Sequence, residues 1–329
     1  MKHKVLFIDD THPVLREELE KTGFLCDHFP GYSRKDHLKI LDQYQGVIIR
    51  GRLTIDKEFL DRAPNLEFIG RVGAGMENID VLYAEKKGIR CLNAPEGNRD
   101  ALGEHTLGML LCLMNKICMA DREVRNGFWK REENRGMEIM GKTIGIIGYG
   151  NMGSAFAQRL KGFEARVLAY DKYKTGFGND FVRESDMETL FAETDILSLH
   201  VPLTGETYDM VNSEYLNTFA KPVFVINTAR GKVLNTEDLV ANIEKGKVLG
   251  AALDVLEYES RSFEKLNRED LPGAFRYLVD SGKVVLTPHI AGWTHESRYK
   301  LARILADKIM AMVTQEKVSK KNRKKHGKK

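Results

Sequence analysis

Cysteine is scarce in this sequence, and the scarcity narrows the kinds of protein it can encode. The 329 residues include four cysteines, Cys26, Cys91, Cys112 and Cys118, and no two of them form a Cys-x-x-Cys pair. A chain of this length can bury a core without disulfide bonds, and the spacing offers no zinc-binding pair. We therefore expect reduced thiols in a cytoplasmic protein and no metal site.

Long apolar runs are absent as well. The most apolar segment, residues 107–114, ends at Asn115 and Lys116, well short of the ~20 residues that cross a bilayer. At the start of the chain, two aspartates stop a short apolar run at residues 5–8, so the regions of a secretory leader are lacking. The sequence predicts neither a membrane span nor export.

Acidic residues are missing from the last part of the chain. Residues 317–329 hold eight Lys or Arg residues, and removing these from the net charge of +4 leaves −4 on residues 1–316. A like-charged segment cannot bury enough apolar surface to order itself, so we predict a basic, disordered tail over residues 316–329. The mildly acidic body makes nucleic acid an unexpected partner, although a weak contact between the tail and a polyanion stays open.

The sequence does contain the alternation of predicted strands and helices that is typical of α/β folds. At ~150 residues per domain the length favours two domains, and short apolar runs alternate with charged, helix-like stretches in both. In the second half these runs are nearly continuous in Val, Ile and Leu, which indicates a doubly wound parallel sheet buried on both faces. The predicted strands are residues 5–8, 47–49, 66–70, 89–92, 143–147, 166–170, 196–201, 223–227, 248–253 and 284–286.

Helices are predicted between these strands from periodicity and capping residues. One long amphipathic helix is expected where apolar residues recur at helical spacing, with its stripe facing a core; the stripe is Leu107, Leu110, Leu111, Met114, Ile117 and Cys118. The other predicted helices are residues 14–21, 154–161, 186–192, 235–245 and 294–313.

A glycine turn after the strand at 143–147 has the setting of a dinucleotide site. Gly148 lets the chain turn, Gly150 lets the backbone approach a pyrophosphate, and Gly153 lets the next helix pack closely on the strand. The start of that helix, at Asn151 and Met152, offers amide donors and a positive dipole end to phosphates. A glycine turn that serves only the fold is the alternative.

Asp171 ends the next predicted strand, 18 residues after Gly153, where a ribose-binding acid belongs. Its carboxylate would accept hydrogen bonds from the adenosine ribose and repel a 2′-phosphate, which favours NAD over NADP. Lys172 beside it works against that preference, and a turn-forming role for Asp171 is the alternative.

Three later residues offer the groups that hydride transfer at an alcohol carbon requires. Arg230 follows the strand at 223–227, Glu259 lies after the strand at 248–253, and His289 follows the strand at 284–286. All three are expected at the carboxyl edge of the sheet, where α/β folds bind ligands. A guanidinium can clamp a carboxylate, an imidazole can exchange a proton near neutral pH, and a carboxylate can orient that imidazole. Taken alone, each has a structural role as its alternative.

Four motifs follow one another in the second half: GIIGYGNMG at 145–153, NTARG at 227–231, ALDV at 252–255 and TPHIAG at 287–292. Together they resemble the D-isomer-specific 2-hydroxyacid dehydrogenase family, and the resemblance covers residues 4 to about 315. It implies two Rossmann-like or flavodoxin-like parallel-sheet domains. A substrate-binding domain of residues 1–98 and 291–315 would be split around an NAD-binding domain of residues 99–290.

The resemblance also implies residue roles. Arg230 would bind the substrate carboxylate and carbonyl, His289 would be the acid/base, and Glu259 would be its partner. Asp254 would meet the nicotinamide side of NAD. Further cofactor contacts are expected at Val201, Pro202, Thr228, Ala229, Arg230, His289 and Gly292.

Two departures from the family pattern affect this assignment. Ser260 stands where proline usually follows the catalytic glutamate, so Glu257 is a second candidate for that role. The charged and aromatic insertion at residues 261–281 is longer than usual, and we expect it to cap the active site or to extend an oligomer contact.

Within the family, the segments at 47–52, 71–80 and 93–98 most resemble D-3-phosphoglycerate dehydrogenase. Several guanidinium groups suit a dianionic phosphate, and solvated surface arginines are the alternative. Ala74 departs from this subgroup, which often has threonine there. The expected substrate-binding residues are Arg50, Arg52, Arg71, Gly73, Ala74, Gly75 and Arg230.

The expected reaction is NAD-dependent oxidation of 3-phosphoglycerate to phosphohydroxypyruvate, which opens serine synthesis, without a regulatory domain. The competing functions are a glyoxylate or hydroxypyruvate reductase and, from another class, a non-catalytic NAD-sensing corepressor. Residues 127–129 (GFW) resemble the family's dimer-contact region, so we expect a homodimer or tetramer; a buried Trp129 is the alternative.

Overall fold

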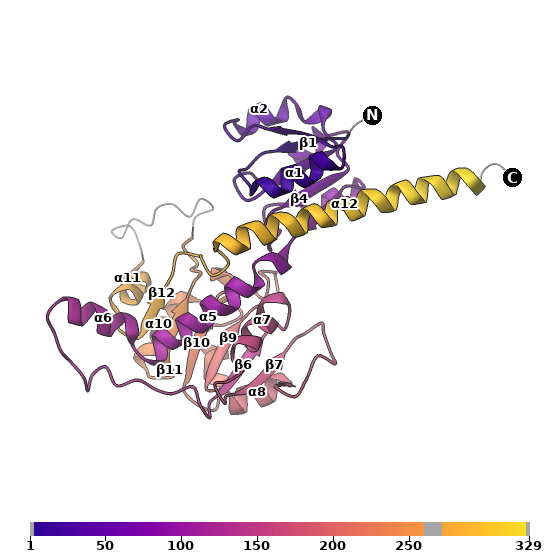
Figure 1. Cartoon of the computed structure of the whole chain (residues 1–329). Coiled ribbons are helices and arrows are strands. Elements are labelled where there is room, and N and C mark those ends of the chain that lie inside the picture. The colour runs from indigo at the N-terminus through magenta and orange to yellow at the C-terminus, as the bar shows by residue number, and fades with distance from the viewer. Residues whose placement is uncertain (1–2, 260–271, 327–329) are drawn as a thin grey trace. The chain divides into compact units, whose positions relative to one another are not determined.

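The computed structural model describes residues 3–259 and 272–326, with side chains as far as residue 315. The chain forms two compact units: unit 1 comprises Met1–Asn98 and Thr294–Lys329, and unit 2 comprises Arg99–Trp293. Both are parallel α/β units, and the first is split around the second, so the expected fold class is confirmed (Figure 1). The chain returns to unit 1 after residue 293, compared with the expected 290.

Unit 1 is built on a five-stranded parallel sheet in the order β2-β1-β3-β4-β5, which is the flavodoxin-like order. Its strands are β1 (Lys4–Phe7), β2 (Leu25–His28), β3 (Gly46–Ile49), β4 (Phe68–Arg71) and β5 (Arg90–Asn93). Its helices are α1 (Pro13–Lys21), α2 (Arg34–Leu38), α3 (Lys57–Asp61), α4 (Val81–Lys86) and α12 (His295–His326), with 3₁₀ helices η1 (Leu41–Gln43) and η2 (Pro95–Gly97).

Helix α12 completes the core on one face of this sheet. Its fully buried Leu305 and Ile309 pack in one cluster with Val5 and Phe68 of the sheet. The helix runs on to His326, so the backbone of the predicted disordered tail is helical through residue 326. Lys, Arg and Gln are good helix formers, and no Gly or Pro interrupts them before Gly327. Among the described helices, none combines the length and apolarity of a membrane span.

Unit 2 is built on a seven-stranded parallel sheet in the order β12-β11-β10-β9-β6-β7-β8, the doubly wound order of dinucleotide-binding domains. Its strands are β6 (Thr143–Ile147), β7 (Arg166–Tyr170), β8 (Val182–Glu184), β9 (Ile196–Leu199), β10 (Val223–Asn227), β11 (Val248–Leu253) and β12 (Val284–Leu286). Its helices are α5 (Arg99–Met114), α6 (Ile117–Arg125), α7 (Asn151–Arg159), α8 (Met187–Glu193), α9 (Ser213–Thr218), α10 (Thr236–Glu244) and α11 (Gly273–Asp280), with η3 (Gly231–Val233).

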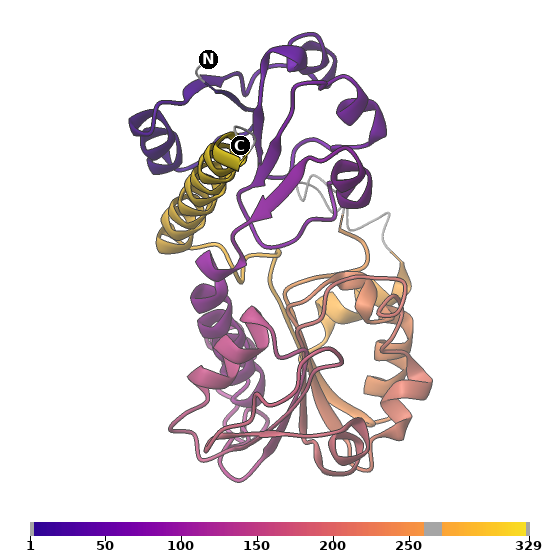
Figure 2. The same ribbon diagram turned by 90° about the vertical axis from the view of Figure 1, so that its right-hand side faces the viewer.

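Helices cover both faces of this sheet, as the continuous apolar strands require (Figure 2). Buried residues of α5 and α7, such as Leu110 and Phe156, form the core on one face. Buried residues of α8, α9, α10 and α11, such as Leu239 and Leu278, form the core on the other. The glycine turn and the strand ends named above therefore project from a sheet that is fixed on both sides.

Other sequence predictions also differ from the structure. Strands β2 and β8 were not predicted, because each is a short edge strand with charged residues among its apolar ones. The predicted single helix through residues 107–118 is two helices, because Lys116 takes a left-handed backbone with φ of 53°. Ile117 beyond the break is 49% exposed, so the apolar stripe does not continue into the core.

Candidate active site

The predicted functional residues of unit 2 follow the carboxyl ends of its parallel strands. Because all seven strands are parallel, the residues that follow β6, β9, β10, β11 and β12 leave the sheet at one edge. In chain order these strands lead to Gly148, His200, Thr228, Asp254 and Thr287. Apart from Asp171, which follows β7, the predicted cofactor and catalytic residues of unit 2 belong to these turns or to the loops that follow them.

The glycine turn has a geometry that side chains would obstruct. Gly148 has a φ of +92°, and a Cβ there would lie 2.6 Å from the carbonyl oxygen of His200. A Cβ on Gly153 would collide with the carbonyl oxygen of Gly148. Gly150 is different, because its own Cβ would meet nothing within 4 Å. The fold requires Gly148 and Gly153, whereas the backbone at Gly150 is left open on the side where a ligand phosphate could approach.

Helix α7 begins in this turn. Gly150 is its N-cap and makes no side-chain capping hydrogen bond, so the first-turn amides at Asn151 and Met152 are not capped by a side chain. Such a helix start favours an anion. Val201, which follows β9, lies beside the turn, with its Cγ1 3.1 Å from the Cβ that Gly148 would carry. Pro202 comes next in the same loop.

Asp171 lies directly against the glycine turn. Its Oδ2 accepts a hydrogen bond from the Tyr149 amide at 2.8 Å, and its Oδ1 accepts from the amides of Tyr173 and Lys174 at 3.0 and 3.1 Å. The carboxylate is thus held at the end of β7 by three backbone donors. It has both the turn-forming role that was the alternative and the position expected of a ribose-binding acid.

The neighbouring Lys172 is already paired. Its ammonium lies 2.6 Å from Glu206 Oε2, and this hydrogen bond raises the pKa of Lys172 and lowers the pKa of Glu206. Tyr173 donates its hydroxyl to the same carboxylate at 2.9 Å. The objection that Lys172 would attract a 2′-phosphate is therefore weaker than the sequence alone suggested.

His289 and Glu259 form a hydrogen-bonded pair. His289 Nδ1 lies 2.8 Å from Glu259 Oε2, and Glu259 Oε1 accepts from the Leu256 amide at 2.6 Å. The other candidate, Glu257, instead accepts from the Thr236 amide at 2.6 Å, at the start of α10. The geometry therefore selects Glu259 as the partner of His289, although serine follows it in the sequence.

Asp254 organises the loop that carries His289. The side chain is 1% exposed, and it accepts hydrogen bonds from the Thr287 hydroxyl at 2.6 Å and from the amides of Ile290 and Ala291 at 2.8 and 2.9 Å. Its backbone carbonyl accepts from the His289 amide at 2.8 Å. Asp254 was predicted as a cofactor contact, and the structure adds that it holds the loop 287–291.

The turn after β10 is held by Asn227. This buried side chain accepts from the Ala229 amide and donates to the Arg230 carbonyl, both at 3.0 Å. Arg230 donates from Nη1 to the Ala229 carbonyl at 2.7 Å. Thr228 is buried, and its hydroxyl lies 3.4 Å from that of Thr106 on α5. The turn that presents Arg230 is therefore rigid.

In unit 1, Arg52 is engaged by the unit itself. Its Nε lies 3.5 Å from the buried Asp9, and Nη2 donates to the carbonyls of Ile8 and Tyr32 at 3.1 and 3.2 Å. Nη1 donates to the carbonyl of Pro30. These contacts favour a structural role for Arg52 over the substrate-binding role expected from the sequence.

Arg50 and Arg71 have other surroundings. Burial lowers the pKa of Arg50, and the charge of Arg298 on α12 lowers it further, so two guanidinium groups of unit 1 repel each other there. Arg71 ends β4, and its guanidinium occupies the space where a Cβ on Gly73 would stand. Ala74 in the same loop accepts from the Asn93 side chain at 2.6 Å. Gly75 follows it in that loop.

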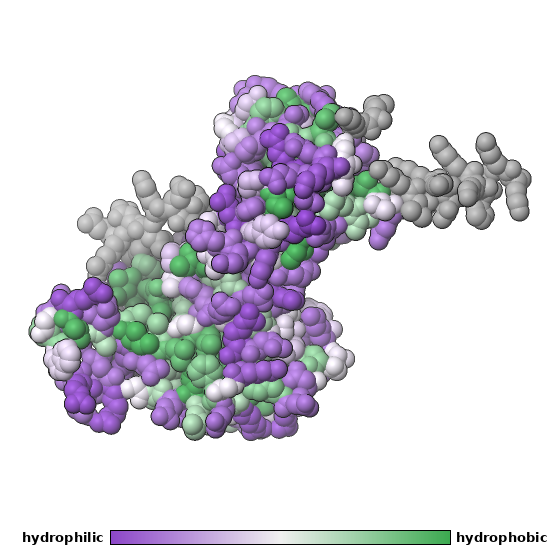
Figure 3. Space-filling model, in the orientation of Figure 1, coloured by the Kyte–Doolittle hydropathy of each residue, from purple (hydrophilic) through white to green (hydrophobic). Residues whose placement is uncertain are grey.

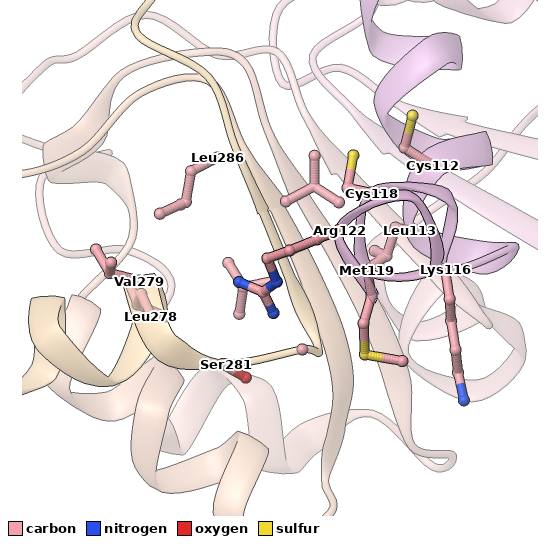
Figure 4. Close-up of a pocket in the computed structure, with 13 residues that line it drawn as sticks. Cys112, Leu113, Lys116, Cys118, Met119, Arg122, Leu278, Val279, Ser281 and Leu286 are labelled. Atoms are coloured by element: carbon pink, nitrogen blue, oxygen red, sulfur yellow. The ribbon is translucent and has the colours of Figure 1, made fainter. Parts of the chain in front are cut away.

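A separate pocket of unit 2 lies between α5 and α6 on one side and α11 and β12 on the other (Figure 4). Apolar side chains such as Leu113 and Leu278 line it together with the cations Lys116 and Arg122. Burial, and then the neighbouring Cys118, raises the pKa of the Cys112 thiol, which disfavours the reactive thiolate. No predicted site residue lines this pocket. Of the insertion at 261–281, residues 261–271 lie outside the described residues, and α11 falls within the rest.

Sequence reasoning missed several residues of this region. Asn227 and Thr287 stand inside the quoted motifs, and the signal for them was their place directly before the functional positions. His105 contacts Thr287, with its Nε2 3.2 Å from the hydroxyl oxygen. Nothing in the sequence around His105 relates it to a loop 182 residues away.

Unit 2 of the chain matches a known protein family. The family model "D-isomer specific 2-hydroxyacid dehydrogenase, NAD binding domain" matches residues 107–291. The chain belongs to the D-isomer specific 2-hydroxyacid dehydrogenase family. Its cofactor is NAD, and the expectation of an NAD-dependent oxidoreductase is confirmed at this level. The residues of the glycine turn and Asp171 fit the cofactor, because the turn leaves its backbone open at Gly150 and places the acid beside it.

Similar proteins carry several names. The chain is 35% identical over 311 residues to D-3-phosphoglycerate dehydrogenase of Archaeoglobus fulgidus, which covers 94% of the chain but 57% of that protein. It is 39% identical over 290 residues to glyoxylate reductase of Thermofilum pendens, covering 85% of the chain and 82% of the relative. It is 35% identical over 296 residues to hydroxypyruvate reductase of Thermotoga maritima, covering 89% and 91%. The chain therefore spans little more than half of the phosphoglycerate dehydrogenase.

Solved structures agree on the architecture. D-lactate dehydrogenase of Aquifex aeolicus, solved with NAD and lactic acid, superposes with a TM-score of 0.79 at 28% identity. The match covers 95% of this chain and 96% of that one.

Gly150→Ala tests the placement of the cofactor. The new methyl group has room in the protein, so stability should fall by no more than about 1 kcal/mol, the usual cost of alanine at an N-cap. A pyrophosphate that approaches this backbone would be displaced, so NADH affinity should fall about tenfold or more. Thermal unfolding and NADH fluorescence titration measure the two effects. Gly108→Ala, an equally open glycine of α5, is the matched control. Unchanged NADH affinity in Gly150→Ala would place the cofactor elsewhere.

Proposed function

We propose that this protein interconverts a 2-hydroxy acid and its 2-oxo acid, with His289 as the acid/base, Glu259 as the partner of His289 and Arg230 as the ligand of the substrate carboxylate. The observation that carries the proposal is the 2.8 Å contact between His289 Nδ1 and Glu259 Oε2 at the edge of the sheet that holds the glycine turn. A histidine with a purely structural role would not need a carboxylate that is itself fixed by the Leu256 amide.

The pair defines how the imidazole handles a proton. With Nδ1–H donated to Glu259, neutral His289 presents Nε2 as an acceptor, and protonated His289 presents Nε2–H as a donor. In the direction of oxidation Nε2 takes the proton of the substrate hydroxyl; in the direction of reduction it returns that proton to the carbonyl oxygen. Glu259 stabilises the imidazolium that exists between these steps. Bound NAD supplies the hydride acceptor or donor.

Arg230 supplies the remaining charge. A guanidinium can bind a carboxylate through two parallel hydrogen bonds, which orients the neighbouring carbon as well as holding it. The turn at Asn227 fixes the backbone of Arg230. The bond from Arg230 Nη1 to the Ala229 carbonyl restrains the guanidinium end of the side chain. The proposed cofactor contacts follow strands of the same sheet edge: Val201, Pro202, Thr228, Ala229, Asp254 and Gly292.

For the substrate we propose the 3-phosphoglycerate and phosphohydroxypyruvate pair. Support comes from Arg50, whose pKa is lowered first by burial and then by a second guanidinium, Arg298 of unit 1, while the Asp9 and Asp10 carboxylates offset part of this effect. Two cations that repel each other are stabilised by an anion of higher charge, and a phosphate dianion meets this need better than a neutral hydroxymethyl group. Arg71 is the third proposed cation.

One observation favours a second candidate, reduction of glyoxylate or hydroxypyruvate. Arg52, expected to bind phosphate, gives its donors to Asp9 and to backbone carbonyls of its own unit. Fewer guanidinium groups are then available for a phosphate, and a small 2-oxo acid needs only Arg230, Glu259 and His289.

We also propose a homodimer. Unit 2 exposes large apolar side chains along one stretch of chain: Ile117, Val124, Phe128, Trp129, Met137 and Met140. Trp129 is 78% exposed within the single chain, so the alternative of a buried tryptophan does not hold there. Figure 3 shows hydrophobic residues gathered between α6 and α5 on this side of unit 2. Exposed apolar surface of this kind marks contact sites.

Glu259→Gln tests the mechanism against a neighbouring carboxylate. Losing the negative charge beside His289 removes the stabilisation of imidazolium, so kcat should fall roughly 10²- to 10⁴-fold while NADH affinity is retained. Steady-state NADH oxidation measures kcat, and fluorescence titration measures NADH binding. Glu257→Gln is the matched control, since that carboxylate binds the Thr236 amide, and it should keep near-normal turnover. Equal losses in the two variants would contradict the proposed roles.

The substrate is tested by comparing phosphohydroxypyruvate with hydroxypyruvate. The wild-type protein should show a higher kcat/KM for the phosphorylated acid, and Arg50→Gln should lower that value about tenfold or more without changing kcat/KM for hydroxypyruvate. Arg52→Gln is the comparison variant and should lower thermal stability instead. Equal kcat/KM for the two acids in the wild type would favour the reductase.

A further inference from the structure

His289 has an unusual backbone. Its φ is +56°, in the left-handed region that few non-glycine residues adopt, and it is the one such residue in the TPHIAG motif. Conformations of this kind persist only where the surroundings determine them. Neighbouring groups must therefore hold the backbone of His289 in place, since its imidazole contacts Glu259.

The Asp254 carboxylate is the immediate support. It lies inside the loop and accepts from the amides of Ile290 and Ala291, the two residues that follow His289. The Asp254 carbonyl accepts from the His289 amide itself. Any rotation of the Asp254 side chain would release two amides of the loop, so the orientation of this carboxylate determines the backbone of His289.

Thr287 and His105 fix that orientation from the other side. The Thr287 hydroxyl lies 2.6 Å from Asp254 Oδ1 and 3.2 Å from His105 Nε2. The hydroxyl has one proton, and the ionised carboxylate can only accept, so the hydroxyl donates to Asp254 and accepts from His105 Nε2–H. His105 Nε2 is also 3.7 Å from Asp254 Oδ1. The His105 imidazole therefore lies close to both the Thr287 hydroxyl and the Asp254 carboxylate.

His105 brings a rigid anchor to the loop. It belongs to the long helix α5, in which residues on both sides of it in sequence, such as Leu102 and Met109, are buried. Thr106, its neighbour on the helix, reaches the Thr228 hydroxyl at 3.4 Å, in the turn before Arg230. One turn of α5 therefore contacts both loops that carry proposed catalytic side chains.

We infer that His105 and Thr287 are positioning residues for hydride transfer: through Asp254 they hold the left-handed backbone of His289, and with it the imidazole that pairs with Glu259. The inference rests on the proposed function of His289. It assigns no contact with substrate to either residue. Their effect on the reaction is to keep the proton-exchanging nitrogen in one place.

The experiment compares variants that keep or remove each donor. Thr287→Val removes the hydroxyl and keeps the shape, whereas Thr287→Ser keeps the hydroxyl. His105→Leu removes the Nε2–H donor, whereas His105→Gln can return an N–H donor at a similar distance from the helix. For each protein, kcat, NADH affinity, thermal stability and the primary isotope effect with NADH deuterated at the transferred position are measured with the best 2-oxo acid of the wild type.

The expected result is a kcat about tenfold lower in Thr287→Val and His105→Leu, with substantial recovery in Thr287→Ser and His105→Gln. Because a displaced imidazole slows the chemical step, the isotope effect on kcat should rise in the two damaged variants. NADH affinity should fall less than kcat, because the glycine turn is untouched and only the proposed contacts at Asp254 and Gly292 lie in the loosened loop. Damaged variants with lower thermal stability but unchanged kcat and isotope effect would overturn the inference.

Hydrogen exchange separates this inference from the proposed function. The amides of Ile290 and Ala291 should exchange faster in Thr287→Val than in the wild type and in Thr287→Ser, whether or not the protein turns over a 2-oxo acid. Unchanged exchange in Thr287→Val would overturn the support assigned to Thr287. A wild type that reduces no 2-oxo acid would contradict the proposed function, and the exchange measurement would still decide whether the His105 and Thr287 contacts hold the loop.

Discussion

The candidate active site depends on the hydrogen bonds of one buried carboxylate, that of Asp254. Asp254 is 1% exposed, and burying an ionised carboxylate costs several kcal/mol unless hydrogen bonds replace its water. Here the Thr287 hydroxyl and two loop amides supply that replacement. The same bonds bind the loop 287–291 to the end of β11. The hydrogen bonds that replace water around the Asp254 carboxylate are therefore the same ones that hold the loop of His289.

This arrangement is possible because the strands are parallel. Turns after β6, β10, β11 and β12 leave the sheet at one edge, so a nucleotide turn, an arginine and a histidine that are distant in sequence can belong to one region. Gly148 and Gly153 allow the turn after β6, and Asn227 holds the turn after β10. Asp254, which follows β11, holds the loop after β12. The sheet provides the common edge, and these local contacts provide the geometry.

The sequence predicted most of this framework, for identifiable reasons. Buried strands of continuous Val, Ile and Leu are conspicuous, and β6, β7, β10, β11 and β12 have the predicted bounds. Short edge strands such as β8 carry no such signal, and the helix break at Lys116 depends on a left-handed residue that periodicity does not reveal. The basic segment was expected to be disordered from its charge, yet good helix formers extend α12 through it.

In the site, too, some residues follow from local sequence rules and others only from tertiary packing. Glycine positions and strand-end residues follow local rules, so Gly148, Asp171 and His289 could be proposed from motifs. Which of two glutamates meets His289, what Arg52 binds, and the contact of His105 with Thr287 depend on tertiary packing across many residues, and only coordinates provide them.

In the proposed reaction, hydride passes between the nicotinamide of NAD and C2 of a 2-hydroxy acid in a fixed orientation. It is tested most directly by incubating the protein with a 2-oxo acid and NADH carrying deuterium at the transferred position, then locating the label and determining the configuration of the product. We expect deuterium at C2 of a single D-hydroxy acid. Product without deuterium, or a racemic or L-hydroxy acid, would contradict it.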